Sequence, residues 1–527
     1  MESLATGEIL SVCLFFALIA ALMLGYPIAF TLPGVAFIFA IVGWALGAFD
    51  LSYLEALPLR YWGIVTNEVL IAVPLFVFMG VMLERSRLAE TLLTTMGELF
   101  GSLPGGLGIS TIVVATLLAA STGIVGATVV TMGLISLPAM LRARYDKRLA
   151  SGLICASGTL CQLIPPSTIL VFLAVILQSA YSEAQMAKGN FTPVTLSVGD
   201  LFAGAFIPGI VLSGLYIVWV IGNAFLKPGS APALKKTSEG RRAFGGRIVV
   251  ALLPPLMLIV AVLGSILAGV ATPTEAASVG AIGAALLTLV KLLAEHFARR
   301  LAPEAVQRAL CRFWLAFFAV TVVLAVVTGA LGVLTLAAVS LVAGVAAASA
   351  IPGVRRQFFG IVDDVSRSTL TITAMVFVIF MGASVFSVVF TRLGGAQLVH
   401  DSLASMPGGA TGALFVVMLV MFILGCFLDP FEIIFVVVPV VGPVLFKMDV
   451  NPIWFAIMIG VNLQTSYLTP PFGFSLFFLK GVAPPEVTTG DIYRGIIPYV
   501  GIQLVCLAIL WVYPALATWL PAAIYGR

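Results

Sequence analysis

The sequence predicts an all-α polytopic membrane protein, and three observations lead to this fold class. Of 527 residues, 61% are hydrophobic and only 9% are charged, whereas a soluble domain carries about 25% charged residues. Apolar runs of about 18 or more residues, enough for a membrane-spanning helix, recur along the whole chain. Two Pro-Pro pairs, Pro165-Pro166 and Pro470-Pro471, interrupt two of these runs. Since adjacent prolines remove backbone donors and unwind a helix, we expect two broken helices.

The apolar runs divide into full spans and shorter arms. We expect spanning helices at roughly 8–27, 29–49, 65–84, 149–180, 201–225, 248–269, 276–294, 313–330, 332–350, 366–391, 452–480 and 492–515. Segments 107–141 and 410–447 each hold two apolar arms of about 15 residues, shorter than the roughly 20 that a span needs, so we predict re-entrant hairpins. Segment 51–63 mixes charged and aromatic residues, as an interfacial helix does. The first run lacks a basic segment before it, and we expect it to be retained.

The basic residues predict which side of the membrane each loop faces. Segment 227–247 holds six Lys and Arg, and further clusters lie at 142–148, 299–312 and 355–356. Placing these clusters in the cytoplasm follows the positive-inside rule. All elements then alternate consistently if both hairpins enter and leave on one side, and both termini lie outside, in the periplasm.

Five sequence marks recur in the same order in the two halves, which predicts an internal repeat. The pairs are Phe78-Met79-Gly80 with Phe380-Met381-Gly382, Pro104-Gly105-Gly106 with Pro407-Gly408-Gly409, Pro138 with Pro443, Pro165-Pro166 with Pro470-Pro471, and Gly199-Asp200 with Gly490-Asp491. The charge map puts the two hairpins on opposite sides. We therefore expect inverted repeats, the arrangement of secondary transporters with a site near the bilayer midplane.

The residues around the breaks are short, oxygen-rich and uncharged. In lipid a freed backbone group costs several kcal/mol unless protein, water or an ion satisfies it. Breaks at 156–167 and 462–471 therefore suit a cavity in which carbonyls and hydroxyls coordinate Na⁺. The alternative is a proline kink whose Ser and Thr hydroxyls bond back onto their own helix.

Charged residues near the second hairpin are candidates for the substrate. Asp429 and Glu432 stand in an apolar stretch, where ionisable residues are functional by default. The alternative for Asp429 is a cap of the next half-helix, and for Glu432 a first-turn acid that complements the helix dipole. Arg392 could pair with a carboxylate, or it could be an interfacial arginine whose side chain snorkels.

The chain resembles the large membrane subunit of the tripartite ATP-independent periplasmic (TRAP) transporters. The matching stretches are 121–138, 145–150, 157–167, 271–277, Leu428-Asp429 and 469–473. The resemblance implies an elevator-type transporter of the ion-transporter superfamily in the bacterial inner membrane. It also implies coupling to a Na⁺ gradient, an organic-acid substrate delivered by a periplasmic binding protein, and a separate small four-helix membrane subunit.

The resemblance also implies roles for individual residues. Substrate contacts would fall on Thr122, Ser167, Arg392 and Asp429. Ligands of two sodium sites would come from Ser121, Thr122, Gly126, Thr128, Ser157, Gly158 and Thr159 in the first half and from Gly425, Asp429, Gln464, Thr465, Ser466 and Thr469 in the second.

The expected domain organisation follows from the repeat and the resemblance. Residues 101–181 and 408–481 would form the two halves of a moving transport domain. Residues 1–100, 182–407 and 482–527 would form the scaffold, including an uncharged extra helix pair at 313–350.

Other functional classes fit less well. The chain lacks a phosphate-binding GxxxxGK[ST] loop and an HExxH motif. We therefore expect no enzyme activity and no nucleic-acid partner. A stand-alone Na⁺ symporter without a binding protein remains the main alternative. A C4-dicarboxylate, an oxo or hydroxy monocarboxylate, a sugar acid and ectoine all remain open as substrates.

Overall fold

The computed structural model describes residues 2–122, 125–192, 195–233, 241–300 and 303–526. All regular secondary structure within these ranges is helical. Nine of the described helices are long and apolar enough to cross a membrane, or up to eleven if two bent pairs each count as one span. The predicted fold class, an all-α polytopic membrane protein, is therefore confirmed.

The N-terminal part runs from the first span to the first hairpin. Its elements are α1 (Glu2–Met23), α2 (Ile28–Ala45), η1 (Leu51–Ala56), α3 (Leu57–Val65), α4 (Glu68–Arg85) and α5 (Leu88–Phe100). The predicted interfacial helix corresponds to η1 and α3, which meet α4 at an angle of 53°. The Asp50 carboxylate accepts a hydrogen bond from the Ser52 N–H and starts η1.

The first hairpin and the first broken helix lie where the prolines and short arms predict them. The hairpin consists of α6 (Gly106–Thr122) and α7 (Val125–Arg142). The broken helix consists of α8 (Lys147–Thr159), η2 (Leu160–Gln162) and α9 (Thr168–Ala187). The peptide bonds Pro165-Pro166 and Pro470-Pro471, one in each break, are both cis.

The second half contains a hairpin and a broken helix of the same kind. The hairpin is formed by α16 (Gly409–Gly425), α17 (Pro430–Val436) and α18 (Val438–Lys447), with a 53° bend between α17 and α18. The broken helix is formed by α19 (Pro452–Leu468) and α20 (Phe474–Val482).

The remaining helices differ from the prediction mainly in length. They are α10 (Val198–Leu226), α11 (Arg241–Leu267), α12 (Pro273–Ala298), α13 (Pro303–Ser349), α14 (Pro352–Arg392), α15 (Gly395–Ala404), α21 (Thr489–Val512) and α22 (Ala515–Tyr525). The sequence predicts neither α5, α15 nor α22, which are short. The predicted span 366–391 is the second part of α14, a helix of 41 residues.

The predicted helix pair at 313–350 is wrong as stated, because one continuous helix of 47 residues, α13, contains the whole segment. This helix is not straight. Trp314 and Ala337 line the same cavity, although a straight helix would hold them roughly 35 Å apart at 1.5 Å per residue. The chain therefore turns back by bending within one helix, not by breaking into two.

Local structure matches between the two halves at several marks of the predicted repeat. α6 and α16 each have 17 residues, and each follows a glycine with positive φ, Gly105 or Gly408. Arg144 and Asp449, both with positive φ, precede the two broken helices. Capping boxes of Ser197 with Asp200 and of Thr488 with Asp491 begin α10 and α21. These matches support the repeat, while its inversion across the membrane stays a prediction.

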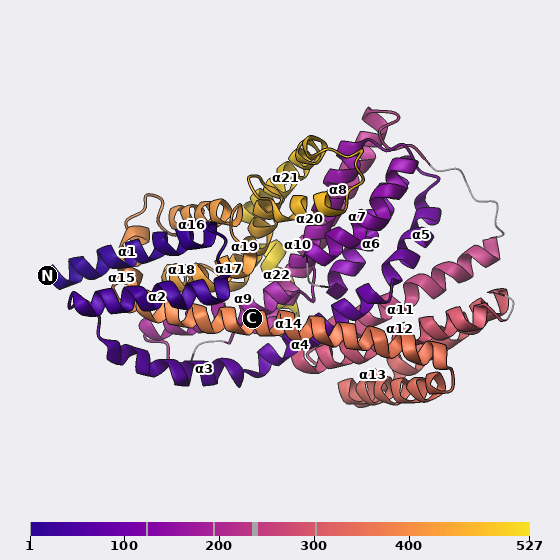
Figure 1. Ribbon diagram of the computed structural model, residues 1–527, viewed down its shortest axis with the longest axis horizontal. Helices are drawn as coiled ribbons and strands as arrows, with labels where there is room; N and C mark the ends of the chain where they lie inside the picture. The colour runs from indigo at the N-terminus through magenta and orange to yellow at the C-terminus, as the bar shows by residue number, and fades with distance from the viewer. Residues whose placement is uncertain (1, 123–124, 193–194, 234–240, 301–302, 527) are drawn as a thin grey trace.

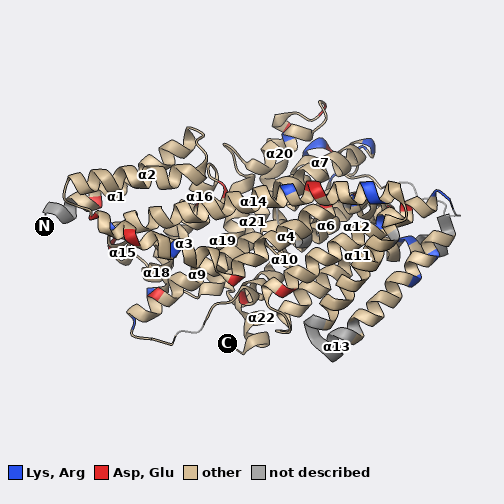
Figure 2. Ribbon diagram, turned by 60° about the horizontal axis from the view of Figure 1, so that its bottom comes forward, with Lys and Arg blue, Asp and Glu red and all other residues tan. Residues whose placement is uncertain are grey.

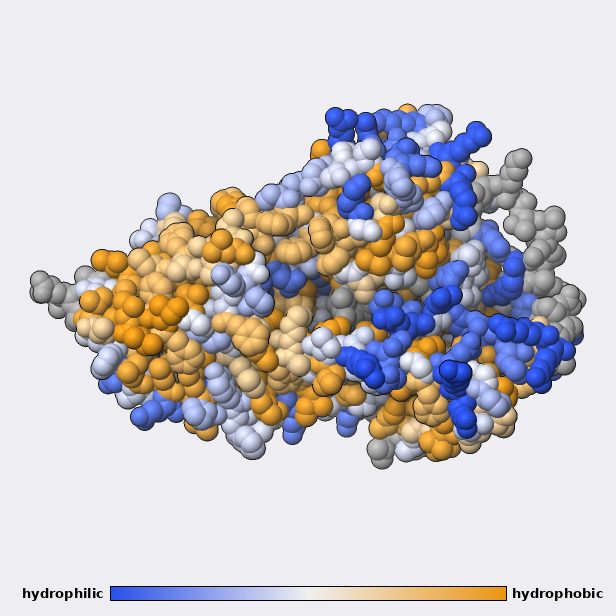
Figure 3. Space-filling view, in the orientation of Figure 1, coloured by the Kyte–Doolittle hydropathy of each residue, from blue (hydrophilic) through white to orange (hydrophobic). Residues whose placement is uncertain are grey.

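The molecule is elongated, and α14 follows its long axis (Figure 1). In that view α1, α2, α16 and α18 lie toward the end that carries the N-terminus, whereas α5, α6, α7 and α8 lie toward the other end. Figure 2 shows Lys and Arg gathered mainly toward the end that carries α7, α11 and α13. Figure 3 shows hydrophilic residues gathered at that same end and hydrophobic residues over most of the remaining visible face.

Candidate functional site

The two broken helices pack against each other. Leu163, in the first break, lies 3.5 Å from the position a Cβ would take on Gly460 of α19. The Ser475 hydroxyl of α20 donates to the Cys155 carbonyl of α8 at 3.0 Å, and the Cys155 thiol donates back to the Ser475 carbonyl at 3.7 Å. Segments about 300 residues apart in sequence therefore form one centre, as the predicted repeat requires.

Each hairpin packs against the helix that follows the other half's break. In hairpin 1, Gly126 of α7 lies against the ring of Phe478 of α20. In hairpin 2, the rings of Phe431 and Phe435 make edge contacts with Phe172 of α9. This crossed packing couples each hairpin to the opposite broken helix.

Helix ends of both polarities meet at the breaks. α9 begins after Ser167 and α20 begins after Gly473, so two helix N-termini border the centre. α8 ends at Thr159 and α19 ends at Leu468, so two C-termini border it as well. N-termini favour anions and C-terminal carbonyls favour cations, which gives the centre groups suited to both.

Most of the predicted hydroxyl ligands are buried and bond back onto their own helices. Ser157 donates to Ile154 O, Thr159 to Ala156 O, Thr465 to Val461 O, Ser466 to Leu463 O and Thr469 to Thr465 O. The structural alternative of back-bonded hydroxyls is therefore present. It does not exclude coordination, because a hydroxyl that donates its proton keeps acceptor lone pairs.

The first predicted sodium cluster is only partly described. Thr128 of α7 is 1% exposed, and its hydroxyl bonds to the Cys161 thiol of η2. A Cβ on Gly158 would lie 2.3 Å from Val129 Cγ2, so only glycine permits this approach of α8 to α7. Ser121 and Thr122 end α6, but their side chains lie outside the described part of the structure.

Ser167, the predicted substrate contact after the first Pro-Pro pair, is 0% exposed and donates to the Gln162 carbonyl at 2.8 Å. Its hydroxyl thereby links the two sides of the break. A ligand at this position would use the remaining lone pairs of the hydroxyl.

The second cluster brings the hairpin tip against α19. A Cβ on Gly425 would lie 2.2 Å from Ser466 Oγ, so the tip touches the break through glycine. The Asp429 carboxylate accepts from Phe431 N–H at 3.0 Å and from the Tyr467 hydroxyl at 3.2 Å. Glu432 accepts from Asp429 N–H at 3.2 Å and completes a capping box. Asp429 thus caps α17 and also ties it to the second break.

Arg392 contacts a residue outside this cluster. It is exposed at the end of α14, with its guanidinium 4.4 Å above the ring of Tyr53 in η1. A cation–π contact with an interfacial segment favours the interpretation of Arg392 as an interfacial residue.

Gln162 and Gln464 are the most informative buried side chains of the two breaks. They are 1% and 0% exposed. Neither the oxygen nor the nitrogen of either carboxamide has a hydrogen-bond partner among the described residues. An unpaired buried polar group costs about 1–3 kcal/mol. We call these two side chains the break amides. A site that retains two unpaired carboxamides is suited to a ligand that brings both hydrogen-bond donors and hydrogen-bond acceptors.

A third buried amide connects the first break to its neighbours. Gln503 of α21 donates to the Tyr216 hydroxyl of α10 at 2.8 Å and lies 3.4 Å from Thr159 Oγ1. Tyr216 and Tyr499 meet edge to face, and both are 0% exposed. α10 and α21 therefore hold the end of α8 in place through a polar contact.

The sequence interpretation missed Gln162, Tyr467 and Gln503 as functional candidates. Gln162 and Tyr467 each precede a Pro-Pro pair by the same number of residues, so the repeat could have selected them. Gln503 stands alone in an apolar span, which is itself a signal of a buried polar role.

Comparisons with known proteins agree with the resemblance. A family model described as "Tripartite ATP-independent periplasmic transporter, DctM component" matches residues 15–352 and 340–516. The C4-dicarboxylate TRAP transporter large permease protein DctM of Vibrio cholerae is 28% identical over 529 residues, 98% of this chain and 99% of that protein. The ectoine TRAP transporter large permease protein TeaC of Halomonas elongata is 24% identical, over 95% and 97%. The YdaH transporter of Alcanivorax borkumensis has a similar fold, with TM-score 0.52 and 15% identity over 89% of this chain and 88% of that one.

Proposed function

The chain belongs to the DctM-component family of tripartite ATP-independent periplasmic transporters, and from this premise we propose that it imports a small organic acid by sodium-coupled secondary transport. A periplasmic binding protein delivers the substrate. The transport domain then carries it across the inner membrane by an elevator motion.

One observation carries the proposal. The two broken helices and the two hairpins meet at one centre, where the break amides Gln162 and Gln464 are buried and have no partner in the described ranges. A carboxamide offers an oxygen to a cation and an N–H to a carboxylate. A sodium ion and a substrate carboxylate together would satisfy both groups, which neither would do alone.

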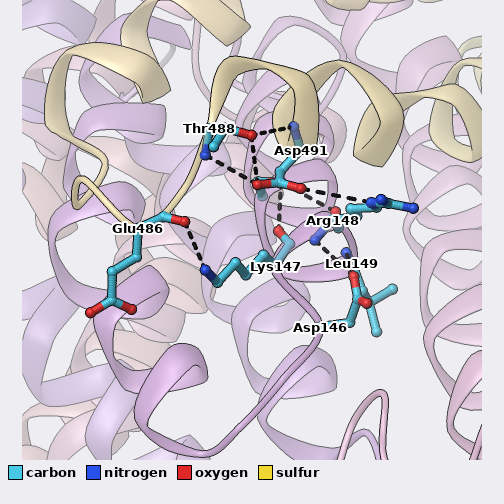
Figure 4. Close-up of polar contacts among 8 residues, drawn as sticks. Asp146, Lys147, Arg148, Leu149, Glu486, Thr488 and Asp491 are labelled. Carbon is cyan, nitrogen blue, oxygen red and sulfur yellow. Dashed lines mark hydrogen bonds and ion pairs between the residues drawn. The ribbon is translucent and has the colours of Figure 1, made fainter.

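We propose a moving body larger than the one the sequence predicts. α21 is attached to α8 at one end, where Lys147 donates to the Glu486 carbonyl at 2.8 Å and Arg148 lies 3.7 Å from Asp491 (Figure 4). Farther along, a Cβ on Gly152 would lie 2.0 Å from the Gly495 carbonyl oxygen, so the two backbones touch. α10 packs its Gly209 against Ile164 of the first break. We therefore assign α10 and α21 to the transport domain, and α1, α2, α4 and α11–α14 to the scaffold.

Coupling follows from the cost of moving charge through the membrane. Without bound ligands, the polar break residues would cross the bilayer unsatisfied, at several kcal/mol per group. Sodium ions beside the substrate carboxylate neutralise its charge and stabilise the closed hairpin tips. The protein therefore moves across the bilayer when sodium and substrate are both bound. These ligands stabilise the closed state more than the open one, and this difference in affinity shifts the population toward the closed state.

The substrate class rests on the relatives. One relative is named for C4-dicarboxylates and another for ectoine, which have in common a carboxylate group and a small size. We propose a small carboxylate for this chain, and a thermal-shift screen of its cognate binding protein would identify it. A binding protein that accepts only uncharged compounds would contradict this substrate class.

The assembly is proposed to contain a separate small four-helix membrane subunit, with both termini of this chain in the periplasm. A membrane-impermeant maleimide applied to intact cells should label Gly526→Cys but not Lys227→Cys in a cysteine-free background. Labelling of Lys227→Cys from outside would reverse the orientation.

Receptor dependence is the experiment that tests the proposed function. The purified chain and its small subunit are reconstituted in proteoliposomes with a sodium gradient, with and without the binding protein. We expect accumulation only with the binding protein. Accumulation without it would favour a stand-alone symporter, and no accumulation with it would contradict import.

A further inference from the structure

The two halves of the repeat bring different charges to the centre. Hairpin 1, residues 106–142, contains no acidic residue in its sequence, whereas hairpin 2 contains Asp429 and Glu432. Neither acid forms a salt bridge with any residue that the structure describes. Because a buried carboxylate needs a compensating charge, the second half favours a cation. The first half has no such charge to repel an anion.

The second break shows how a break of this repeat can bind a carboxylate. The Tyr467 hydroxyl donates to the Asp429 carboxylate at 3.2 Å. The offset that relates Pro138 to Pro443 also relates Gln162 to Tyr467. The first break therefore has an amide donor where the second has a hydroxyl donor, but its own hairpin supplies no carboxylate to accept from it.

The packing beside these two donors supports the same register. In the first half, the Thr128 hydroxyl of α7 bonds to the thiol of Cys161, the residue before Gln162. The matching residues of the second half are Ile433 and Ser466, and both lie against the position that a Cβ on Gly425 would take. Each hairpin thus meets its own break through equivalent residues.

The start of α9 adds donors beside Gln162. The Ser167 hydroxyl donates to the Gln162 carbonyl at 2.8 Å and does not cap the first turn of α9. Residues 160–170 are all buried, so this helix begins away from water. Residues 470–472, which precede α20, are exposed instead. A buried helix start without a side-chain cap favours an anion.

We propose that Gln162 and the start of α9 bind the substrate carboxylate, whereas Gln464 and Asp429 bind a sodium ion. This assignment rests on the proposed function and adds to it which half holds which charge. The substrate carboxylate accepts from the Gln162 amide as the Asp429 carboxylate accepts from Tyr467. Gln464 precedes Tyr467 by about one helical turn, and its amide oxygen serves the cation in the half that carries the acids.

The test replaces each amide by an acid. Gln162→Glu, Gln464→Glu and the matched control Gln397→Glu, at an exposed amide of α15, are purified with the small subunit in detergent. Thermal unfolding is measured in sodium or choline, with succinate, pyruvate, gluconate or ectoine as carboxylate probes. The wild type and Gln397→Glu should be stabilised by sodium and, in sodium, by at least one probe.

The two site variants should respond in different ways. Gln162→Glu should lose the response to the carboxylate probes, because like charges repel, and keep the response to sodium. Gln464→Glu should keep the carboxylate response and lower the half-saturating sodium concentration about tenfold, since an added negative charge attracts the cation.

The reverse pattern, in which Gln162→Glu binds sodium more tightly and Gln464→Glu alone loses the carboxylate response, would overturn the assignment. A wild type that responds to none of the four probes would overturn it as well. Receptor-dependent uptake by the wild type decides the proposed function separately, so either proposal can fail without the other.

Methionine variants keep the assignment testable if an acid prevents folding. Methionine is apolar and similar in length to glutamine. Gln162→Met should lose the carboxylate response and keep the sodium response, whereas Gln464→Met should raise the half-saturating sodium concentration. Identical behaviour of the two folded variants would show that both amides serve one ligand, and the division of charges would be wrong.

Discussion

The carboxamide of Gln162 lies in the first break, between hairpin 1 and α19, with no partner among the residues described. A protein that only needed a stable kink would gain from an apolar side chain here, because removing an unsatisfied buried amide recovers about 1–3 kcal/mol. Retaining the amide therefore points to a ligand that is bound for part of the transport cycle.

Replacing Gln162 by leucine separates stability from function. We expect Gln162→Leu to raise the thermal unfolding midpoint of the ligand-free protein, since about 1–3 kcal/mol of desolvation cost is removed, and to abolish uptake. Gln397→Leu, an exposed amide on α15, is the matched control and should change neither property. A Gln162→Leu protein that transports normally would remove the break amide from the site.

Asp429 combines two roles that a single substitution can separate. Asparagine caps a helix nearly as well as aspartate, so Asp429→Asn should keep α17 and change stability by less than about 1 kcal/mol. It removes the negative charge beside Tyr467, and we expect uptake to be abolished or strongly reduced. Asp401→Asn, on the surface of α15, is the control. Normal uptake by Asp429→Asn would reduce this residue to a structural cap.

The sequence singled out polar residues as site candidates, whose roles stay predictions, but it did not show which other residues they contact. The hydroxyls and the hairpin acid stood out as candidates because polar residues are rare in an apolar run. That the Ser and Thr hydroxyls bond back onto their helices, and that Asp429 meets Tyr467, depends on how helices far apart in the sequence pack. The contact of Arg392 with Tyr53 could not be predicted for the same reason, because it depends on how η1 packs against the end of α14.

At the scale of the element, the Pro-Pro pairs and the short arms were strong predictors. Both breaks lie at the proline pairs 165–166 and 470–471, and both hairpins lie at the short arms, whereas a third pair, Pro254-Pro255, lies inside the continuous helix α11. The helices α5 and α15 were not predicted because they are short and amphipathic, with too few apolar residues to mark a span. The sequence divides the uncharged run 313–350 into two spans, whereas the structure holds it in one bent helix, α13.

The contact between α8 and α21 gives a prediction at this scale. A Cβ on Gly495 would lie 2.2 Å from the Arg148 carbonyl oxygen, whereas a Cβ on Gly501 of the same helix would meet open space. We expect Gly495→Ala to destabilise the protein by about 1–3 kcal/mol, as overpacking does, and Gly501→Ala to have little effect. Thermal unfolding in detergent measures both. Equal midpoints would mean that α21 is not held against α8.

At the scale of the whole molecule, the distribution of basic residues and the positions of the two repeat halves both follow the long axis. Basic residues gather toward one end of the elongated body (Figure 2), and the two hairpins lie toward different ends (Figure 1). The fold class could be predicted from the composition and from the apolar runs that recur along the chain. The proposed assignment of α10 and α21 to the moving body could not be predicted, because these helices resemble scaffold spans in sequence and differ in what they contact.

The most direct test of the central claim is sodium-dependent accumulation at this site. The complete transporter with its binding protein is reconstituted in proteoliposomes, and accumulation is measured with an inward gradient of sodium or of choline at the same membrane potential. The account predicts concentrative uptake with sodium, none with choline, and none by Gln162→Leu under either condition. Unchanged accumulation with choline would contradict sodium coupling and would direct attention to protons instead.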